Sequence, residues 1–523
     1  MKNHMDLSWF YSRSQIAVYF STRLSSLRPH KSKLRNPISI LQELNRHQWL
    51  MFLCGFLARA WDSFDNYSVS MTVTELEKAF NADNKGISWS MTITMMLRPV
   101  GAIMTGICSD RYGRKWPLVL NLSFLVFLEL VSGFCNTLPQ FLGVRSLYGI
   151  AMGGVFGPAA ATALEDLPYD ARGVLSGCFE LSSAMGNLLA AGMYCALVPT
   201  TSHGWRSLYW FGAGPPMLII ALRCWLPETR CFRAMKAERE AEAAELSAME
   251  QAQSKSSLQA FISDTAKALK NNWVLLLYIV FLLAAIISCA HGSSDFFPTF
   301  LKDQAQLSTI KTTVITISGQ LGGFVGGVIT GYASSIMGRR LTMMTACVFG
   351  GALIPAYIMP RGMALAASTF FQQFFIGGVL GPVPIHLLEL SPQAIRTLVV
   401  GVAYQLGSLA SSATPTIQAI IVQRFPLPDG KNGMKRFNYG LAIAIFMGAG
   451  LALMVLFLVL GPEMSHEERE KEAEAAKQRD RMILDGLSLE QSIEKGSVLE
   501  GEMLETKLGE EGISGIKCIE CAH

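Results

Sequence analysis

Apolar stretches of about 20 residues recur along nearly the whole chain, and each is long enough to cross the hydrocarbon core of a lipid bilayer. The overall composition agrees with this pattern. Half of the residues are hydrophobic and only 16% are charged, whereas soluble domains carry roughly 25% charged residues. The sequence therefore predicts an all-α membrane protein that crosses the bilayer many times.

The apolar stretches fall into two groups of six. The first group covers residues 48–74, 86–108, 116–136, 139–163, 173–198 and 205–226. The second group covers residues 273–301, 309–333, 341–359, 363–388, 397–423 and 438–461. A charged central segment, 227–272, divides a first six-helix bundle at 48–226 from a second at 273–461, and tails cover 1–47 and 462–523. We therefore expect twelve transmembrane helices in a 6+6 arrangement.

The two halves carry the same sequence plan. At a constant offset the matching pairs are Gly154/Gly378, Gly157/Gly381, Pro158/Pro382, Glu165/Glu389, Pro168/Pro392, Arg172/Arg396 and Gly177/Gly401. A second match pairs Gly106-x3-Asp110-Arg111-x-Gly113-Arg114-Lys115 with Gly331-x3-Ser335-x2-Gly338-Arg339-Arg340. A repeat this long indicates a duplicated unit of several helices, because solenoid repeats have periods of ~20–50 residues.

Both termini are expected on one side of the membrane, because twelve is an even number of spans. The basic N-terminal tail and the Lys- and Arg-containing central segment favour the cytosol for that side. The predicted loop 424–437 on the opposite side weakens the charge argument, since it holds Arg424, Lys431, Lys435 and Arg436. The tails are long and polar, and any regulatory partners are expected to bind there.

The run of residues 106–115 resembles the signature loop of the major facilitator superfamily of membrane transporters, and it returns in the second half with Ser335 in place of Asp110. Its glycines permit a tight reversal and the close approach of two helix ends. Asp110 can lie at a helix N-terminus and pair with a basic group. The resemblance implies a loop that faces the cytosol, and gating or conformational roles for Gly106, Asp110, Arg111, Gly113, Arg114, Arg145, Glu165, Arg172, Gly338, Arg339, Glu389 and Arg396.

Few ionisable residues fall inside the predicted spans, and each is a functional candidate because a charge within a bilayer is costly. They are Arg59, Asp62 and Asp65 in span one, Arg98 in span two, Glu129 in span three, Glu180 in span five, and His291 and Asp295 in span seven.

Arg98 lies near the middle of the second span, where its guanidinium offers a rigid fork that matches a carboxylate. One interpretation is that it binds a substrate anion. The other is a structural ion pair with Asp62 or another acid, although Arg59 and Asp62 are spaced i,i+3 and can satisfy each other. Glu180 is either an acid that lines the transport path or a residue that faces a neighbouring helix.

His291 and Asp295 are spaced i,i+4 and therefore share one face of span seven. In a site of low dielectric such a pair can share and release a proton within the physiological pH range. The alternative interpretation is a hydrogen bond that belongs to a gate near the end of the helix. Zinc is not expected there without a third ligand, nor at Cys518-x2-Cys521, which lacks a second cysteine pair. We expect no metal and no cofactor.

The His291-x-Ser-x-Asp295 run, followed by FFPTFL, resembles the seventh-span signature of the fungal Jen-type monocarboxylate/proton symporters in the sialate/proton symporter family. WDSFDN at 61–66 is similar to an acidic element of organic acid/proton symporters, and YQLGSLASS at 404–412 is similar to the eleventh span of the Jen-type family. The resemblance implies substrate binding by Arg98, His291, Gln405 and Ser408, and proton coupling by Asp295, His291, Asp62 and Asp65.

The chain departs from that family at three positions. Ile287 and Ser408 stand where the family has asparagines, and Ser294 stands where it has a glutamine. These changes remove amide donors that can orient a carboxylate. They bear on the identity of the acid more than on the substrate class.

The sequence thus predicts a proton-coupled symporter of small organic acid anions, of the lactate and pyruvate type, that works by alternating access about a central site. Its partners would be a small carboxylate anion, a proton and the lipid bilayer of the plasma membrane. The alternatives are a transporter of dicarboxylates such as succinate or malate, or of another small solute, and a nutrient sensor that does not transport. No nucleotide, nucleophile or nucleic-acid motif stands out, so neither an enzyme nor a nucleic-acid partner is expected.

Overall fold

The structure is a computed structural model that describes residues 21, 35–81, 84–248, 257–360, 362–427 and 436–462, all within one compact unit. Most of the two tails, and with them Cys518 and Cys521, lie outside the described residues. The predictions for those segments therefore stay predictions.

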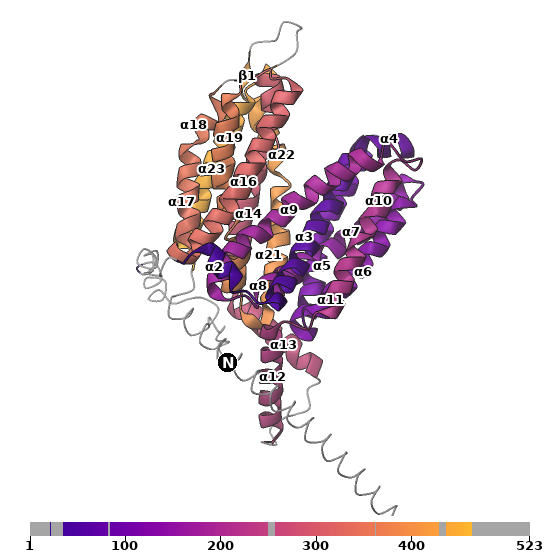
Figure 1. Ribbon diagram of the computed structural model, residues 1–523, viewed down its shortest axis with the longest axis vertical. Helices are drawn as coiled ribbons and strands as arrows, with labels where there is room; N and C mark the ends of the chain where they lie inside the picture. The colour runs from indigo at the N-terminus through magenta and orange to yellow at the C-terminus, as the bar shows by residue number, and fades with distance from the viewer. Residues whose placement is uncertain are drawn as a thin grey trace, which may run out of the picture. The chain divides into compact units, whose positions relative to one another are not determined.

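Helices occupy all six spans predicted in the first half (Figure 1). They are α3 (Arg46–Met71), α4 (Val73–Phe80), α5 (Asn84–Tyr112), α6 (Lys115–Gly133), α7 (Leu138–Gly153), α8 (Phe156–Leu164), α9 (Tyr169–Leu197), α10 (Trp205–Ala213) and α11 (Pro215–Trp225). A short helix, α2 (Pro37–Gln42), precedes them, and the central segment forms α12 (Arg230–Ala248) and α13 (Ser257–Asn271).

The second half repeats the pattern. Its helices are α14 (Trp273–Ser294), α15 (Phe297–Thr299), η2 (Phe300–Gln304), α16 (Thr309–Met337), α17 (Arg339–Ala352), α18 (Ile354–Ile358), α19 (Ala364–Leu380), α20 (Val383–Leu390), η3 (Gln393–Ile395), α21 (Arg396–Ser411), α22 (Thr414–Gln423) and α23 (Tyr439–Leu460). Between α22 and α23, β1 (Pro426–Leu427) pairs antiparallel with β2 (Arg436–Phe437).

Several predicted spans are interrupted helices rather than single ones. Proline lacks the N–H of a regular helix and crowds the preceding turn, and accordingly α10 ends before Gly214-Pro215 and α22 begins just before Pro415. Among the described residues, eight helices, counted with joined pairs such as α7–α8, are long and apolar enough to cross a membrane. The other four predicted spans correspond to α3, which carries buried charges, and to the interrupted pairs α10–α11, α17–α18 and α21–α22.

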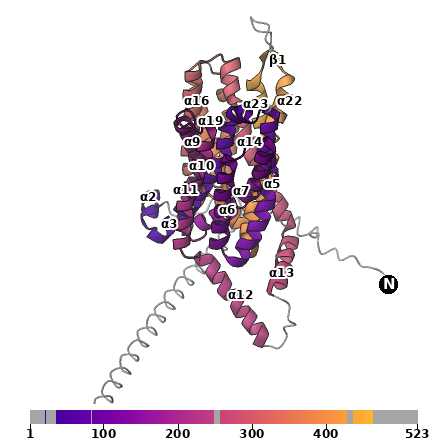
Figure 2. The same ribbon diagram turned by 90° about the vertical axis from the view of Figure 1, so that its right-hand side faces the viewer.

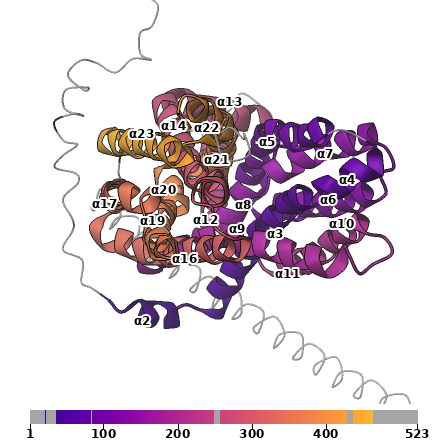
Figure 3. The same cartoon turned by 90° about the horizontal axis from the view of Figure 1, so that it is seen from above.

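The two halves pack with the same pairing of spans, which confirms the predicted 6+6 plan. In the first bundle α3 packs on α9, α5 on α7, and α6 on α10. In the second bundle α14 packs on α21, α16 on α19, and α17 on α23. Between the bundles, α5 and α8 contact α21, and α9 contacts α16 (Figures 1 and 3). The contact of α5 with α21 and that of α9 with α16 are therefore equivalent, because each joins the second span of one half to the fifth span of the other.

The segments that connect the helices lie at two opposite ends of the bundles. α2, α12 and α13 lie at one end, whereas α4 and the β1–β2 hairpin lie at the other (Figures 1 and 2). We call the first of these the signature end, because it also holds the turns between α5 and α6 and between α16 and α17.

Candidate functional site

The signature turn is built twice with the same backbone and the same ion pair. Gly113 and Gly338 both have positive φ, +103° and +95°, a conformation that residues with a Cβ rarely adopt. The residue after each glycine is a buried arginine. Arg114 Nη2 lies 3.1 Å from Glu165 Oε1, and Arg339 Nη2 lies 2.9 Å from Glu389 Oε1. The duplicated motif therefore ties the start of the third span to the end of the fourth span in each half.

Asp110 makes the first signature turn different from the second, because its carboxylate bonds to the second bundle. Asp110 Oδ1 accepts from the backbone N–H of Thr397 (3.1 Å), and Oδ2 accepts from that of Leu398 (2.9 Å). These are free N–H groups in the first turn of α21, where the helix dipole also favours an anion. Ser335, the equivalent residue in the second half, instead accepts from Arg339 (3.1 Å). Buried Arg396 begins α21 beside this cap.

The bundles touch closely at the signature end because glycines line the contact. A Cβ added to Gly106 would lie 2.6 Å from the Leu398 Cα, and one added to Gly157 would lie 2.7 Å from the Thr397 carbonyl oxygen. In the equivalent contact, a Cβ on Gly331 of α16 would lie 2.5 Å from the Gly173 carbonyl oxygen of α9. The signature end of the interface is therefore shut in this structure.

Three further side chains fix the loops at this end. Arg172 donates to the carbonyl oxygen of Leu167 (2.9 Å) and holds the turn between α8 and α9. The Arg111 guanidinium lies over the ring of Phe261 in α13, 5.6 Å from its centroid. The Asp166 carboxylate, which sequence reasoning missed, accepts from the backbone N–H of Arg230 (2.9 Å) at the start of α12. Burial raises the pKa of the Asp166 carboxyl.

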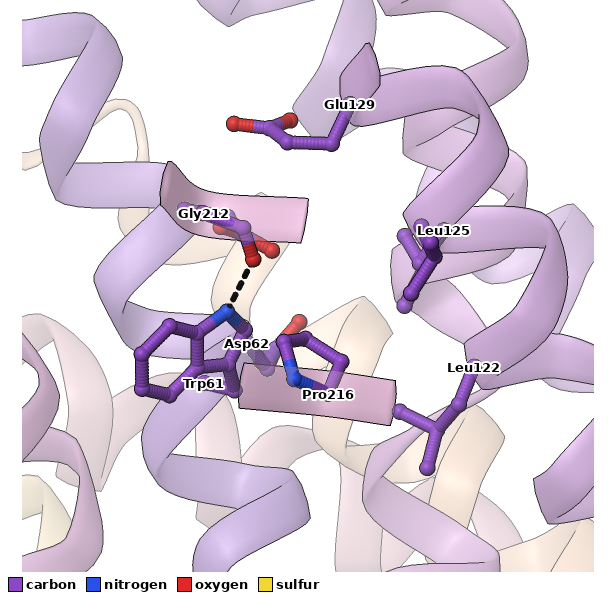
Figure 4. A pocket seen from close by; sticks show the side chains of 9 residues that line it. Trp61, Asp62, Leu122, Leu125, Glu129, Gly212 and Pro216 are labelled. Atoms are coloured by element: carbon purple, nitrogen blue, oxygen red, sulfur yellow. Dashed lines mark hydrogen bonds between the residues drawn. The ribbon is translucent and has the colours of Figure 1, made fainter. Parts of the chain in front are cut away.

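An acidic pocket lies inside the first bundle, and Glu129, one of the acids that line it, pairs with Arg145 (Figure 4). Arg145 Nη1 lies 3.6 Å from Glu129 Oε2, and Tyr148 donates a hydrogen bond to Asp65. A Cβ added to Gly212 would lie 3.2 Å from Glu129 Oε1 and 3.3 Å from Asp65 Oδ1, so both carboxylates face the same point. Two acids here share one guanidinium. The pocket is lined by Trp61, Asp62, Asp65, Leu122, Leu125, Val126, Glu129, Gly212 and Pro216.

Asp62 pairs with its neighbour on the same helix and not with Arg98. Arg59 Nη1 lies 2.6 Å from Asp62 Oδ2, which is the i,i+3 arrangement that the spacing allowed. The other terminal nitrogen of Arg59 donates to the hydroxyl of Tyr404 in α21, also at 2.6 Å. The structural ion pair between Arg98 and Asp62 that the sequence left open is therefore absent from this structure.

Arg98 is buried, only 7% exposed, and makes contacts with neutral groups alone. Its Nη2 lies 3.1 Å from Asn66 Oδ1 and 3.0 Å from Met152 Sδ. Within the described part of the chain it forms no ion pair, and its Nε has no hydrogen-bond partner. Asp62, which is paired with Arg59, acts on Arg98 only from beyond ion-pair distance, and a buried guanidinium without a direct ion pair is energetically unfavourable. Asn66 and Met152 carried no signal in the sequence, since neither is ionisable.

Gln405, on α21 of the second bundle, contacts the first bundle at Gly153, next to the Met152 that contacts Arg98. Its Nε2 donates to the carbonyl oxygen of Gly153 (3.4 Å), and its Oε1 is buried with no partner among the described residues. Gly153 also packs directly on the backbone of Arg98. The structure therefore brings Arg98 and Gln405 together at Met152–Gly153.

His291 and Asp295 form a separate pair on α14 and the residue that follows it. His291 Nδ1 lies 3.4 Å from Asp295 Oδ1, and the two side chains are 48% and 30% exposed. Neither residue bonds to Arg98 or Gln405 in the described structure. Ser408 lies one turn beyond Gln405 on α21 and is half-buried. The described residues contain no cluster of three or more His, Cys, Asp or Glu that is arranged to hold a metal ion.

The Arg114–Glu165 pair gives a test of how the signature end is stabilised. Glu165→Leu leaves a buried guanidinium without its main partner, and we expect the free energy of unfolding to fall by about 3 kcal/mol. Arg114→Met combined with Glu165→Leu should regain part of this loss, because the guanidinium is gone and Asp110, which lies 3.5 Å from Arg114, keeps its hydrogen bonds to the backbone N–H groups of α21. Thermal unfolding of the purified protein in detergent measures both. The control is Glu240→Gln in the exposed Lys236–Glu240 pair, which should have little effect. A double variant less stable than Glu165→Leu would contradict the prediction.

Comparison with known proteins agrees with the fold and the motifs. The family model described as sugar (and other) transporter matches residues 48–475. A carboxylic acid transporter protein homolog of Saccharomyces cerevisiae is 34% identical over 465 residues, which cover 87% of this chain and 75% of that protein. The sialic acid transporter NanX of Escherichia coli is 22% identical over 80% of this chain and 95% of that protein.

A crystal structure of a double-tryptophan mutant of XylE has the same fold, with a TM-score of 0.62 over 82% of this chain and 98% of that chain, at 18% identity. The fold is therefore the twelve-helix 6+6 architecture of membrane transporters, and the protein is a transporter rather than an enzyme. The signature turns, the duplicated bundles and these matches together show that the chain belongs to the sugar (and other) transporter family of the major facilitator superfamily.

Proposed function

We propose that this protein is a proton-coupled symporter that carries small monocarboxylate anions, of the lactate and pyruvate type, across the plasma membrane by alternating access. The observation that carries the proposal is the buried Arg98 guanidinium, which contacts only neutral groups in the described structure. A substrate carboxylate would supply the missing counter-charge through two parallel hydrogen bonds. The names of the two relatives, which are transporters of carboxylic acid and of sialic acid, support an acid as substrate.

The charges around the site favour one carboxylate over two. Arg59, the other guanidinium in this region, already has Asp62 as its partner. That leaves Arg98 to bind an anion, with Gln405 placed to donate or accept one further hydrogen bond. A dicarboxylate would bring a second charge for which this region offers no second open cation among the described residues. Transport of succinate or malate is therefore the alternative and not the first proposal.

The proposed transport cycle starts from the conformation described here. The bundles meet through Gly106, Gly157 and the Asp110 cap at the signature end. In our proposal this end faces the cytosol, as do both termini, and the structure corresponds to a carrier that is closed toward the cytosol. The residues of the duplicated turns would then act as the gate whose ion pairs and cap rearrange when the other state forms.

We propose that the proton binds at His291 and Asp295, with Asp65 as the second candidate. His291 and Asp295 are close enough to share a proton and are partly exposed, so that protons can reach them. Asp65 and Glu129 face each other, and among the described residues Arg145 forms an ion pair with Glu129 and not with Asp65, so a proton on Asp65 would remove the repulsion between the two acids. Asp62 is a weaker candidate because its carboxylate already forms an ion pair with Arg59.

The test of the function is uptake of labelled lactate and labelled succinate, in separate assays, into cells that display the protein at their surface. We expect lactate uptake to rise in acidic medium and to collapse when an uncoupler removes the proton gradient. Faster uptake of succinate under the same conditions would keep the mechanism and replace the substrate. Absence of uptake of both acids would reject the proposal, and binding without uptake would favour a sensor.

Replacement of Arg98 tests the anion site. Arg98→Met removes the charge and both hydrogen bonds to a carboxylate, so kcat/KM for lactate uptake should fall by about 100-fold or more. Arg98→Lys keeps the charge but not the fork and should retain part of the activity. Arg206→Met is the control, because Arg206 bonds to the turn at Cys135 and Asn136, away from the site. Unchanged kinetics in Arg98→Met would remove this residue from the substrate site.

Replacement of Asp295 tests the proton site. Asp295→Asn keeps the shape of the side chain but cannot release a proton, and we expect it to abolish accumulation of lactate against its gradient while downhill exchange remains. Asp303→Asn, a change at an exposed acid in η2, is the control. Accumulation that persists in Asp295→Asn but disappears in Asp65→Asn would transfer the role to Asp65.

A further inference from the structure

Arg59 is the centre of a cluster that joins the two bundles. Its guanidinium donates to Tyr404 of α21 and to Asp62 of α3. It also lies over two aromatic rings, 5.3 Å from the centroid of Phe156 and 5.1 Å from that of Tyr404. These rings stack on each other across the interface, with centroids 3.6 Å apart and planes 14° apart. All four side chains are buried, so the cation depends on them in place of water.

The cluster lies between the proposed anion site and the shut signature end. One face of α21 carries the contacts with the first bundle in successive turns: Thr397 and Leu398 at the Asp110 cap, Gly401 beside Gly157, Tyr404 at Arg59, and Gln405 at Gly153. Going along α21 from the signature end, the contact of Tyr404 with Arg59 is thus the last one before Gln405 and the proposed anion site at Arg98. If the signature end opens, α21 has to leave the first bundle along this face, and Tyr404 leaves with it.

Glu180 is a half-buried acid that no other feature of the site explains. Its Oε2 is buried and has no hydrogen-bond partner among the residues that the structure describes. Glu180 lies on α9, within electrostatic range of both Arg59 and Tyr404. One turn farther along these helices, Ser63 Oγ and Ser183 Oγ are 2.8 Å apart, so α3 and α9 run side by side at this level. Glu180 belongs to the same bundle as Arg59.

We propose that Arg59 is a gating switch that exchanges partners between Tyr404 and Glu180. In the conformation described here Arg59 bonds to Tyr404 and holds α21 against the first bundle. When the signature end opens, Tyr404 departs with the second bundle and Arg59 turns to Glu180, while Asp62 stays bonded in both states. A buried guanidinium needs partners in each state, and Glu180 supplies the second one from within the first bundle. The inference rests on the alternating-access mechanism proposed above, not on the identity of the substrate.

The experiment measures how often the signature end opens, without any substrate. Thr397→Cys, introduced after replacement of the eleven native cysteines, places a thiol at a position that is fully buried in the closed interface. Its rate of alkylation by a membrane-permeant maleimide reports opening. Tyr404→Phe keeps the ring stack and removes the hydrogen bond to Arg59, and it should raise this rate by about tenfold. Glu180→Gln withdraws the acid that Arg59 needs in the open state, and it should lower the rate by a similar factor.

The opposite directions of the two effects distinguish a switch from a purely structural role. Tyr194→Phe is the matched control, because Tyr194 also donates to a carboxylate, Glu75 (2.7 Å), but within the first bundle alone. It should leave the alkylation rate unchanged. An unchanged rate in Tyr404→Phe, or a rate that is unchanged or raised in Glu180→Gln, would overturn the proposal. Because no substrate is present, failure of lactate and succinate uptake would leave this readout intact, so the two proposals fail separately.

Discussion

A guanidinium inside a membrane protein needs counter-charge or hydrogen bonds from the protein, and this constraint organises the first bundle. Arg114 has Glu165, Arg145 has Glu129, and Arg59 has Asp62. Each pair joins groups that would otherwise be unfavourable so far from water. Arg98 is the exception, since its contacts are to an amide oxygen and a thioether sulfur. Because Arg98 lacks a direct ion pair, an anionic ligand would be stabilised most beside its guanidinium.

The duplication gives both bundles the same signature turn, and the differences between the two halves make the contacts of these turns unequal. Both halves keep the glycine with positive φ and the buried arginine–glutamate pair. Only the first half has an acid, Asp110, that caps a helix of the other bundle, because Ser335 bonds within its own half. Close glycine packing occurs both between α5 and α21 and between α9 and α16. The contact between α5 and α21 has the Asp110 carboxylate in addition, so the two contacts between the bundles are not held in the same way.

The sequence predicted what local patterns encode. Apolar length located the twelve spans, the repeat located both signature turns, and i,i+3 spacing allowed the Arg59–Asp62 pair. It did not predict which residues meet across helices. Asn66, Met152 and Tyr404 became partners of buried arginines only through tertiary packing, and the helix break before Pro215 was hidden inside an apolar run. Which side chains contact each other across two helices depends on how each helix is rotated about its axis and shifted along it, and composition and periodicity do not determine either.

The separation between the candidate anion and proton sites limits how they can be coupled. Arg98 and Gln405 meet at Met152–Gly153, whereas His291 with Asp295, and Asp65 with Glu129, form their own clusters without a bond to Arg98. In the proposed mechanism a proton at either cluster would therefore not neutralise the substrate directly. It would change which conformation is more stable, and the anion would do the same at Arg98. Coupling would then be a property of the interface along α21, and groups that hold this interface, such as Arg59 and Asp110, would affect transport without contact with either ligand.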